Sequence, residues 1–177
     1  MRVPDDTARS TGTAGESAVE GGGRRRVTLG MLVGSGHKIM LFTLPFLVIG
    51  LVIAIGYPSV LDFGDPPAAL RAVSVVVLAA GVAIWAWSVA LILTRVPRGE
   101  LITTGPYGWV RHPIYTSVAL LVLPWLGLLF GSWLGALVGI GMYLGSRRYA
   151  PEEEAALAKE FGPAWDHYRD AVRIPWL

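Results

Sequence analysis

The sequence predicts an all-α, polytopic integral membrane protein with two transmembrane helices, a helical hairpin and amphipathic cytoplasmic C-terminal helices. Composition is the first observation behind this prediction: 53% of the 177 residues are hydrophobic, 16% are charged, and the mean hydropathy is +0.52. A soluble protein of this size needs more polar side chains to cover its surface. Patterning is the second observation, because three long stretches carry no formal charge. Together these observations exclude a soluble enzyme.

The N-terminal residues 1–27 differ in composition from the rest of the chain. Thr, Ser, Gly, Ala, Asp, Glu and Arg dominate there without apolar periodicity, which predicts a disordered tail. The tail ends in three arginines, and no apolar segment with a small-residue cleavage site follows as in a secretory signal. We therefore expect a single membrane domain over residues 28–177.

Two of the charge-free stretches have the length of one membrane crossing. Residues 39–61 and residues 72–94 each comprise 23 residues without a formal charge. About 20 apolar residues cross the hydrocarbon core of a bilayer, so each stretch is predicted to form one transmembrane helix. Small residues on the second helix are expected to leave a gap that admits a lipid tail: Gly81, Ala83, Ala86 and Ser88.

The third charge-free stretch is too long for one crossing. It comprises the 35 residues 112–146, which as a single helix would extend about 50 Å across a hydrocarbon core of about 30 Å. Pro124, Gly127 and the pair Gly131-Ser132 offer places to interrupt it. We expect a tight hairpin of two helices, about 114–129 and 133–149, each about 24 Å long.

The basic residues predict the orientation of the chain in the membrane. With the N-terminus in the cytoplasm, Arg71 is the one basic residue on the outer side, and the other 14 lie inside. The positive-inside rule therefore predicts that both termini are cytoplasmic. The heavy use of arginine, alanine and glycine indicates a bacterial source and hence the cell membrane.

The C-terminal residues 150–177 are polar but carry an apolar stripe at helical spacing. We expect two short helices along the cytoplasmic membrane surface, divided at Gly162-Pro163, with Pro163 near the start of the second. The stripe consists of Leu157, Phe161, Trp165, Tyr168 and Val172.

Several classes of site are excluded by residue types that are missing or badly spaced. The chain has no cysteine, so it has no disulfide, thiolate zinc site, iron–sulfur cluster or cysteine nucleophile. The three histidines, His37, His112 and His167, lack the spacing of metal ligands on a helix, and we expect no metal. A net charge of +2 is too balanced to predict a nucleic-acid partner.

The segment 95–115 carries one group of chemically capable side chains. Gly105-Pro106 predicts a turn, and Pro113 predicts a helix start that brings His112 and Tyr115 near one face. The exposed N–H groups of such a helix start are suited to hold a carboxylate. The alternative is an ordinary membrane interface of aromatic residues with positive-inside anchors, namely Arg95, Arg98 and Arg111.

A second group of polar side chains follows the expected hairpin. Three consecutive carboxylates, residues 152–154, come directly after Pro151. They could simply be the acidic first turn of a solvated helix with Pro151 at its first position.

The chemically capable residues form an ordered set of motifs along the chain. They are Gly105-Pro106-Tyr107, Arg111-His112-Pro113-x-Tyr115, an apolar hairpin, Glu153-Glu154-x-x-Leu157, Phe161-Gly162, Tyr168 and Arg173-Ile174-Pro175. Over about residues 72–176 this set resembles the isoprenylcysteine carboxyl methyltransferase family and its relatives, the phospholipid N-methyltransferases. The resemblance implies an integral membrane enzyme that moves a methyl group from S-adenosylmethionine to a lipophilic or membrane-associated acceptor, with its catalytic core at about residues 95–177.

The resemblance also implies a cofactor site at the cytoplasmic membrane face. Glu153 would bind a polar end of S-adenosylmethionine with Glu154 as its supporting partner, and residues 118–120 would pack against the pocket. The other implied cofactor contacts, several of them through the backbone, are Thr104, Gly105, Pro106, Tyr107, His112, Tyr115 and Ser117.

The implied catalytic residues are His112, Tyr115 and Arg148. His112 is the candidate general base where the acceptor arrives protonated. The isoprenylcysteine enzymes have a substrate-contacting arginine four residues before the glutamate that corresponds to Glu153. In this sequence Tyr149 occupies that position, and Arg148 lies beside it.

Two alternatives of a different kind stay open. An NADPH-dependent membrane reductase resembles this family in its C-terminal half, but such proteins are longer, and the chain has no Gly-x-Gly-x-x-Gly motif. A non-catalytic membrane scaffold would tolerate the loss of His112 and Glu153. The expected partners are a lipophilic or lipid-linked substrate and membrane lipid, while the sequence leaves the methyl acceptor and the oligomeric state open.

Overall fold

The computed structural model describes residues 29–174, which form helices and connecting loops without a strand. The all-α prediction is therefore confirmed for this part of the chain, and the predicted tail 1–27 lies outside it. In chain order the elements are α1 (Leu29–Gly56), α2 (Pro58–Leu61), α3 (Ala68–Arg95), η1 (Val96–Arg98), η2 (Gly105–Gly108), α4 (Pro113–Thr116), η3 (Ser117–Val122), α5 (Leu123–Leu129), α6 (Leu134–Phe161) and α7 (Pro163–Ala171).

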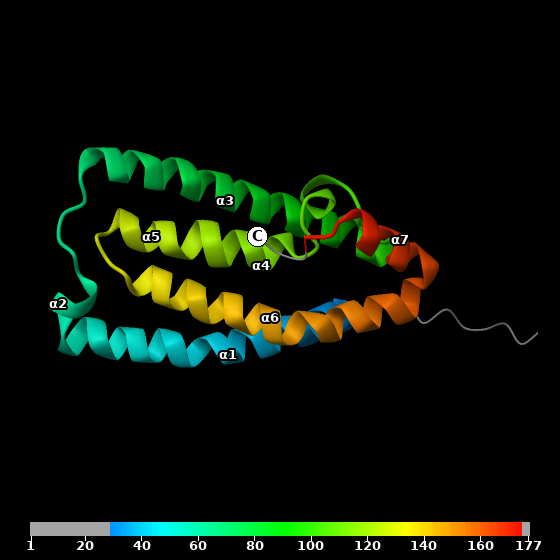
Figure 1. Cartoon of the computed structure of the whole chain (residues 1–177), viewed down its shortest axis with the longest axis horizontal. Coiled ribbons are helices and arrows are strands. Elements are labelled where there is room, and N and C mark those ends of the chain that lie inside the picture. Colours follow the sequence, from blue (N-terminus) through cyan, green and yellow to red (C-terminus); the bar gives the residue numbers. More distant parts are fainter. Residues whose placement is uncertain (1–28, 175–177) are drawn as a thin grey trace, which may run out of the picture.

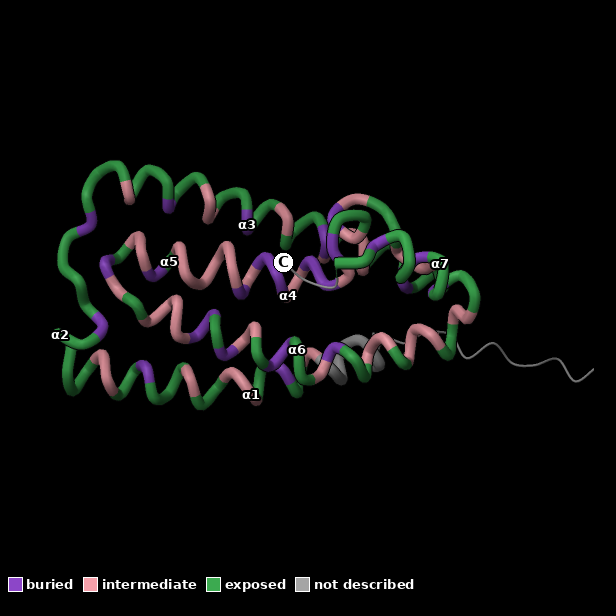
Figure 2. Tube along the Cα trace, viewed as in Figure 1, coloured by how far each residue is buried: buried purple, intermediate pink, exposed green. Residues whose placement is uncertain are grey.

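Four helical rods lie side by side in the order α1, α6, the α4–η3–α5 run, and α3 (Figure 1). The connector that contains α2 and the turn between α5 and α6 meet at one end of the rods. The loop from η1 to α4 and the helix α7 gather at the other end. Buried positions concentrate on α4, η3 and the facing part of α6, in the middle of the assembly (Figure 2).

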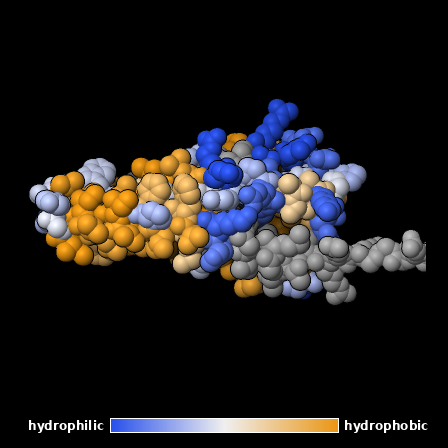
Figure 3. Space-filling model, turned by 90° about the horizontal axis from the view of Figure 1, so that it is seen from below, coloured by the Kyte–Doolittle hydropathy of each residue, from blue (hydrophilic) through white to orange (hydrophobic). Residues whose placement is uncertain are grey.

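Within residues 29–174, two helices are long and apolar enough to cross a membrane, over Gly36–Gly56 and Ala68–Arg98. Only 11% of each apolar window is buried inside the protein, so these are not the core helices of a soluble fold. Their outward side chains include Val52, Ile55 and Val76, all more than 60% exposed. Apolar side chains cover one part of the molecule and polar side chains gather toward the end that carries α7 (Figure 3). Such a continuous apolar surface is suited to lipid rather than water.

The first predicted span, 39–61, ends earlier than expected. The helix α1 stops at Gly56, and Pro58 begins the separate short helix α2. The residue before a proline is pushed out of the helical region, and Tyr57 accordingly has φ −140° and ψ 63°. The second predicted span, 72–94, lies wholly within α3.

The predicted hairpin is present, with its turn at Gly131-Ser132. Gly131 has φ +71°, a left-handed conformation that favours glycine. Gly127 and Gly135 do not break the helices but let them touch, because a Cβ on Gly135 would lie 2.1 Å from the Leu123 carbonyl oxygen. Pro124 also leaves the first arm unbroken, since the π-helical segment η3 widens the turn just before it.

The second arm of the hairpin continues far beyond its predicted end at residue 149. The helix α6 runs for 28 residues to Phe161, so the expected short helix at residue 150 is wrong. Pro151 lies inside α6, where its ring nitrogen cannot donate a helical hydrogen bond, and the preceding turn of the helix at Arg147 is exposed. Ala150 is fully buried, and Lys38 of α1 forms an ion pair with Glu152, so tertiary contacts hold the helix through the proline.

The helix α7 begins at Pro163 after a break at Gly162, as the sequence predicts. Its apolar stripe, however, packs into the protein rather than onto a membrane surface. Trp165, Tyr168 and Val172 form a buried cluster against Leu101 and against residues of α6. The stripe thus fixes α7 to the loop that precedes α4.

The small-residue face of α3 is closed where a lipid gap was expected. A Cβ on Gly81 would lie 2.7 Å from Leu121 Cβ of η3, and Ser88 is fully buried. Ala83 and Ala86 are exposed on other sides of the helix. The expected opening between α3 and the hairpin is therefore absent along this contact.

Candidate functional site

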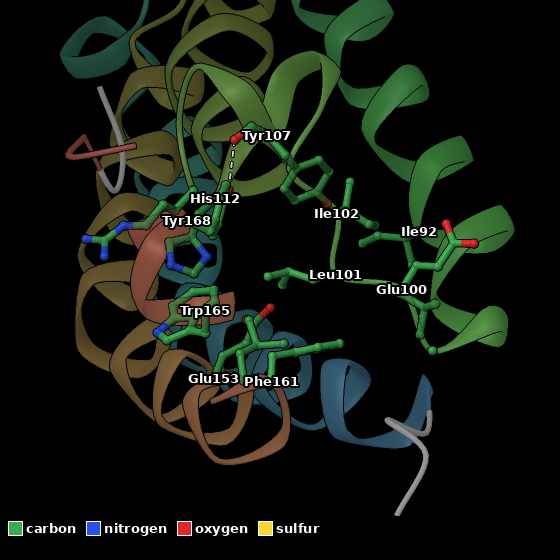
Figure 4. Close-up of a pocket in the computed structure, with 14 residues that line it drawn as sticks. Ile92, Glu100, Leu101, Ile102, Tyr107, His112, Glu153, Phe161, Trp165 and Tyr168 are labelled. Carbon is green, nitrogen blue, oxygen red and sulfur yellow. Dashed lines mark hydrogen bonds between the residues drawn. The ribbon is translucent and has the colours of Figure 1, made fainter. Parts of the chain in front are cut away.

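A cavity lies where the loop after α3, the helix α6 and the helix α7 meet (Figure 4). It contains about 570 Å³ of empty space when its open mouth is included. Its wall is mainly apolar, with a few polar side chains among the aliphatic and aromatic ones. The lining residues are Ile92, Val96, Gly99, Glu100, Leu101, Ile102, Tyr107, Arg111, His112, Glu153, Leu157, Phe161, Trp165 and Tyr168.

The turn 105–108 is fixed against α3 by aromatic packing. Gly105 has φ +64°, a left-handed conformation that favours glycine, and a Cβ there would make a tight contact, 3.1 Å from the Trp87 ring. Trp87 in turn meets Trp109 edge-on, with ring centroids 6.2 Å apart. This packing aims the Tyr107 ring into the cavity.

Tyr107 is also held from the C-terminal side. The hydroxyl of Tyr168 on α7 donates a hydrogen bond of 2.8 Å to the Tyr107 carbonyl oxygen. Burial raises the pKa of Tyr168 to about 12, so its hydroxyl keeps the proton that it donates. Burial and the nearby Glu153 carboxylate raise the pKa of Tyr107 well above its ordinary value. Both phenols are therefore neutral at physiological pH.

His112 is held by a carboxylate from α6. It is 4% exposed, and its Nε2 lies 2.9 Å from Glu154 Oε1. Burial opposes the charge on Glu154, but the His112 hydrogen bond and the charges of His112, Arg111 and Arg169 outweigh it and lower the pKa of the carboxyl. An ionised carboxylate only accepts, so Nε2 of His112 carries the proton in this contact.

The adjacent carboxylate, Glu153, faces a different partner. The Tyr115 hydroxyl donates a hydrogen bond of 3.3 Å to Glu153 Oε2, and Glu153 lines the cavity while Glu154 does not. One residue along a helix turns the side chain by about 100°, which separates the two carboxylates. The rings of His112 and Tyr115 stack with centroids 6.0 Å apart. The start of α4 and the middle of α6 are thus joined by two parallel polar contacts.

Tyr115 also borders a second cavity, on the side of α1. This apolar groove contains about 660 Å³ of empty space including its opening, and it lies beside the first candidate membrane span. The hydroxyl oxygen of Tyr115 approaches Gly36 of α1, where a Cβ would lie 3.8 Å from it. The groove is lined by Gly36, Ile39, Met40, Thr43, Leu44, Leu47, Tyr115 and Met142.

The structure brings together only part of the site suggested by the sequence. Tyr107, His112 and Glu153 line the cavity; Tyr115 and Glu154 support it through the hydrogen bonds described above. The remaining residues do not line the cavity: Thr104, Gly105, Pro106, Ser117 and Arg148.

Those residues have other surroundings. Ser117 is buried and donates a hydrogen bond to the Ile114 carbonyl, 3.1 Å away. Arg148 is exposed and lies over the Tyr149 ring, 5.5 Å from its centroid. Pro106 is fully buried beneath the turn, and Thr104 is exposed just before it.

Arg111 lines the cavity. From the sequence alone, it could equally be an arginine that anchors the chain at the membrane interface. Its side chain is only 11% exposed and lies 3.4 Å from Glu154. Leu101, Ile102 and Trp165 also form part of the cavity wall, although none of the motifs in the sequence includes them. The apolar stripe on α7 is the one feature of the sequence that indicates that this helix packs against another part of the chain.

The sequence matches the model of one protein family. The family model of the isoprenylcysteine carboxyl methyltransferase (ICMT) family matches residues 68–159, which is more than half of the chain. The match runs from the start of α3 nearly to the end of α6 and includes Tyr107, Arg111, His112 and Glu153. Searches of curated proteins and of solved structures each found no match. The chain belongs to the isoprenylcysteine carboxyl methyltransferase family, a family of membrane methyltransferases.

Proposed function

We propose that this protein is an S-adenosylmethionine-dependent methyltransferase that acts on a lipophilic acceptor at the cytoplasmic face of the membrane. One observation carries the proposal: within the family-matching segment, Tyr107, His112 and Glu153 line one cavity at the polar end of the apolar helices. The orientation with both termini in the cytoplasm is part of the proposal and rests on the positive-inside rule.

The residues that line the cavity fit S-adenosylmethionine in their chemistry. The aromatic wall of Tyr107, Phe161 and Trp165 is suited to a flat purine ring. The Glu153 carboxylate can pair with an ammonium or accept hydrogen bonds from ribose hydroxyls. The buried Arg111 Nε has no hydrogen-bond partner among the described residues, which leaves a donor for an anionic group.

When bound, S-adenosylmethionine supplies a methyl group whose bond to sulfur breaks as the bond to the acceptor atom forms, leaving a neutral thioether. The residues of this chain need only align the reactants and exclude water, because no covalent enzyme intermediate is required. Where the acceptor carries a proton, we assign the base to His112. Glu154 holds the proton on Nε2 of that ring, which makes Nδ1 the basic nitrogen of the neutral form.

The apolar groove beside α1 is the proposed site of the acceptor's hydrocarbon chain. It lies at the level of the first candidate span, and Tyr115 connects it to Glu153 in the wall of the cavity. A chain in this groove would reach the site from the bilayer, while the donor would enter from the polar end. The exposed Arg148 on α6 is proposed to contact an anionic part of the acceptor.

Calorimetric titration of the detergent-solubilised full chain with S-adenosylmethionine tests this function. We expect saturable binding that Glu153→Ala weakens by about 10- to 100-fold, because a hydrogen bond to a charged group contributes about 1.5–3 kcal/mol. His112→Ala is expected to weaken binding or turnover in parallel. Glu160→Ala, which removes an exposed glutamate from the same helix, is the matched control and should bind like the wild type.

The other outcomes separate the alternatives. Folded protein that binds NADPH instead of S-adenosylmethionine would be a reductase. Folded protein that binds neither would be a scaffold. A cooperative thermal unfolding transition in the same detergent establishes that each variant is folded.

A further inference from the structure

Arg111 is buried to an unusual degree for an arginine at the end of an apolar helical bundle. Its side chain is 11% exposed, and its backbone N–H donates a hydrogen bond of 3.2 Å to the Ile174 carbonyl. The segment after α7 therefore covers the residue and fixes its backbone. Arginine is almost never buried unless its guanidinium is paired, so its partners decide what it does here.

Among the described residues, the ion-pair partner of Arg111 lies on one side of the guanidinium. Nη1 lies 3.4 Å from Glu154 Oε2, while the other oxygen of that carboxylate contacts His112. The Nε atom is buried and has no hydrogen-bond partner in the part of the chain that the structure describes. A buried donor on a charged group that stays unsatisfied destabilises the folded protein. Two hydroxyls share this condition, Ser74 Oγ and Thr116 Oγ1, but neither is charged and neither lines the cavity.

The charged side chains around the cavity suit a ligand that carries both a positive and a negative charge. Arg111 and Glu153 contribute opposite charges to the same wall, and Glu100 lies farther along it. An α-amino acid group carries a carboxylate and an ammonium on one carbon, which matches that pair. The Nε edge of a guanidinium binds a carboxylate side-on with a second N–H, a geometry that lysine cannot reproduce.

We infer that Arg111 is a binding residue whose Nε donates to a ligand carboxylate inside the cavity. This inference rests on the proposed function, in which the methionine part of S-adenosylmethionine supplies the carboxylate. A carboxylate on the methyl acceptor has the same chemistry and is the second source. Arg111 would then bind the carboxylate of the donor's amino-acid end, and Glu153 would bind its ammonium. Glu154 would keep its ion pair with the guanidinium of Arg111.

The experiment compares ligands with and without the carboxylate. The solubilised full chain is titrated with S-adenosylmethionine and with decarboxylated S-adenosylmethionine, which keeps the sulfonium and the amine. We expect the wild type to prefer the carboxylate form by about 10-fold or more. Arg111→Lys keeps a positive charge opposite Glu154 but removes the side-on donor, and Arg111→Met removes the charge as well. Both variants should lose the preference and bind the two ligands alike.

Arg169→Met is the matched control for an indirect effect. Arg169 also acts electrostatically on Glu154 but does not line the cavity, so its loss should leave the carboxylate preference unchanged. In a second arm, an S-prenylated N-acetylcysteine and its carboxamide are compared in the same proteins. If only the second arm shows a preference for the free acid that depends on Arg111, the carboxylate that Arg111 binds belongs to the methyl acceptor.

Each remaining result overturns a defined statement. A carboxylate preference that persists in both Arg111 variants, or no Arg111-dependent preference in either arm, overturns the inference and leaves the methyl-donor site standing. Folded wild-type protein that binds none of these ligands overturns the proposed function together with the inference.

Discussion

The apolar half of the molecule and its polar end are held together by different kinds of contact. In the apolar half the hairpin arms meet at glycines, so that backbone touches backbone at Gly127 and Gly135. At the polar end side chains bond across long stretches of sequence, as in His112 to Glu154 over 42 residues and Tyr168 to Tyr107 over 61 residues. The backbone contacts at the glycines tolerate no added side-chain volume, whereas the side-chain hydrogen bonds at the polar end depend on charge and protonation.

The apolar groove and the polar cavity are joined by one residue. Tyr115 stands at the boundary, lining the apolar groove while its hydroxyl bonds to Glu153 of the polar cavity. If the proposed function holds, a substitution in the groove should affect the binding of the acceptor and one in the cavity the binding of the donor, unless it disrupts the shared helices.

The largest effect is expected from adding volume to the hairpin. Gly135→Leu should lower the free energy of unfolding by about 3 kcal/mol, because the new side chain would meet the Leu123 carbonyl and the Gly127 backbone. The thermal unfolding midpoint in detergent measures this loss. Gly56→Leu is the control, since a Cβ at Gly56 meets nothing within 4 Å. Equal midpoints for the two variants would contradict the close backbone contact.

A smaller and more selective effect is expected from filling the groove. Leu44→Trp should raise the KM for an S-prenylated N-acetylcysteine by about 10-fold, or about 1.4 kcal/mol, while S-adenosylmethionine binding stays unchanged. Val48 lies one turn farther along α1, is as exposed as Leu44 and does not line the groove, so Val48→Trp is the matched control. If both variants raise the KM alike, the groove is not the acceptor site.

The smallest effect is expected from the charge of Glu154, and it depends on pH. Because the folded state lowers the pKa of Glu154, its ionised form contributes stability above the ordinary glutamate pKa of about 4.3. That contribution is lost as the pH falls through the lower pKa of the folded state. The stability difference between the wild type and Glu154→Gln should thus be constant near neutral pH and shrink in acid.

The thermal unfolding midpoint, measured from pH 7 to acidic pH, checks this expected decrease in the stability difference. Glu160→Gln, at an exposed position of the same helix, is the control. The charged groups that face Glu154 are Arg111, His112 and Arg169. A difference that grows on acidification would mean that the carboxylate is stabilised less in the folded state than in the unfolded one.

Local features of the sequence are enough to predict the helices of the apolar half. The lengths of the charge-free stretches predict the spans, and Gly131-Ser132 and Gly162-Pro163 mark real breaks. The end of α1 and the continuation of α6 are not predicted in this way. Pro58 ends one helix, while Pro151 is accommodated in another, because buried Ala150 and the Lys38–Glu152 ion pair support the backbone on both sides.

By itself the sequence determined the all-α class, the two apolar spans, the hairpin and the motifs that belong to the family, because these depend on composition and on neighbours a few residues apart. Only the tertiary structure decided that Arg111 is buried, that α7 closes the cavity, and that Glu153 faces it while Glu154 holds His112. The physical reason is that burial and pairing depend on which distant segments pack together. A step of one residue along a helix also turns the side chain by about 100°, so neighbours such as Glu153 and Glu154 face different surroundings.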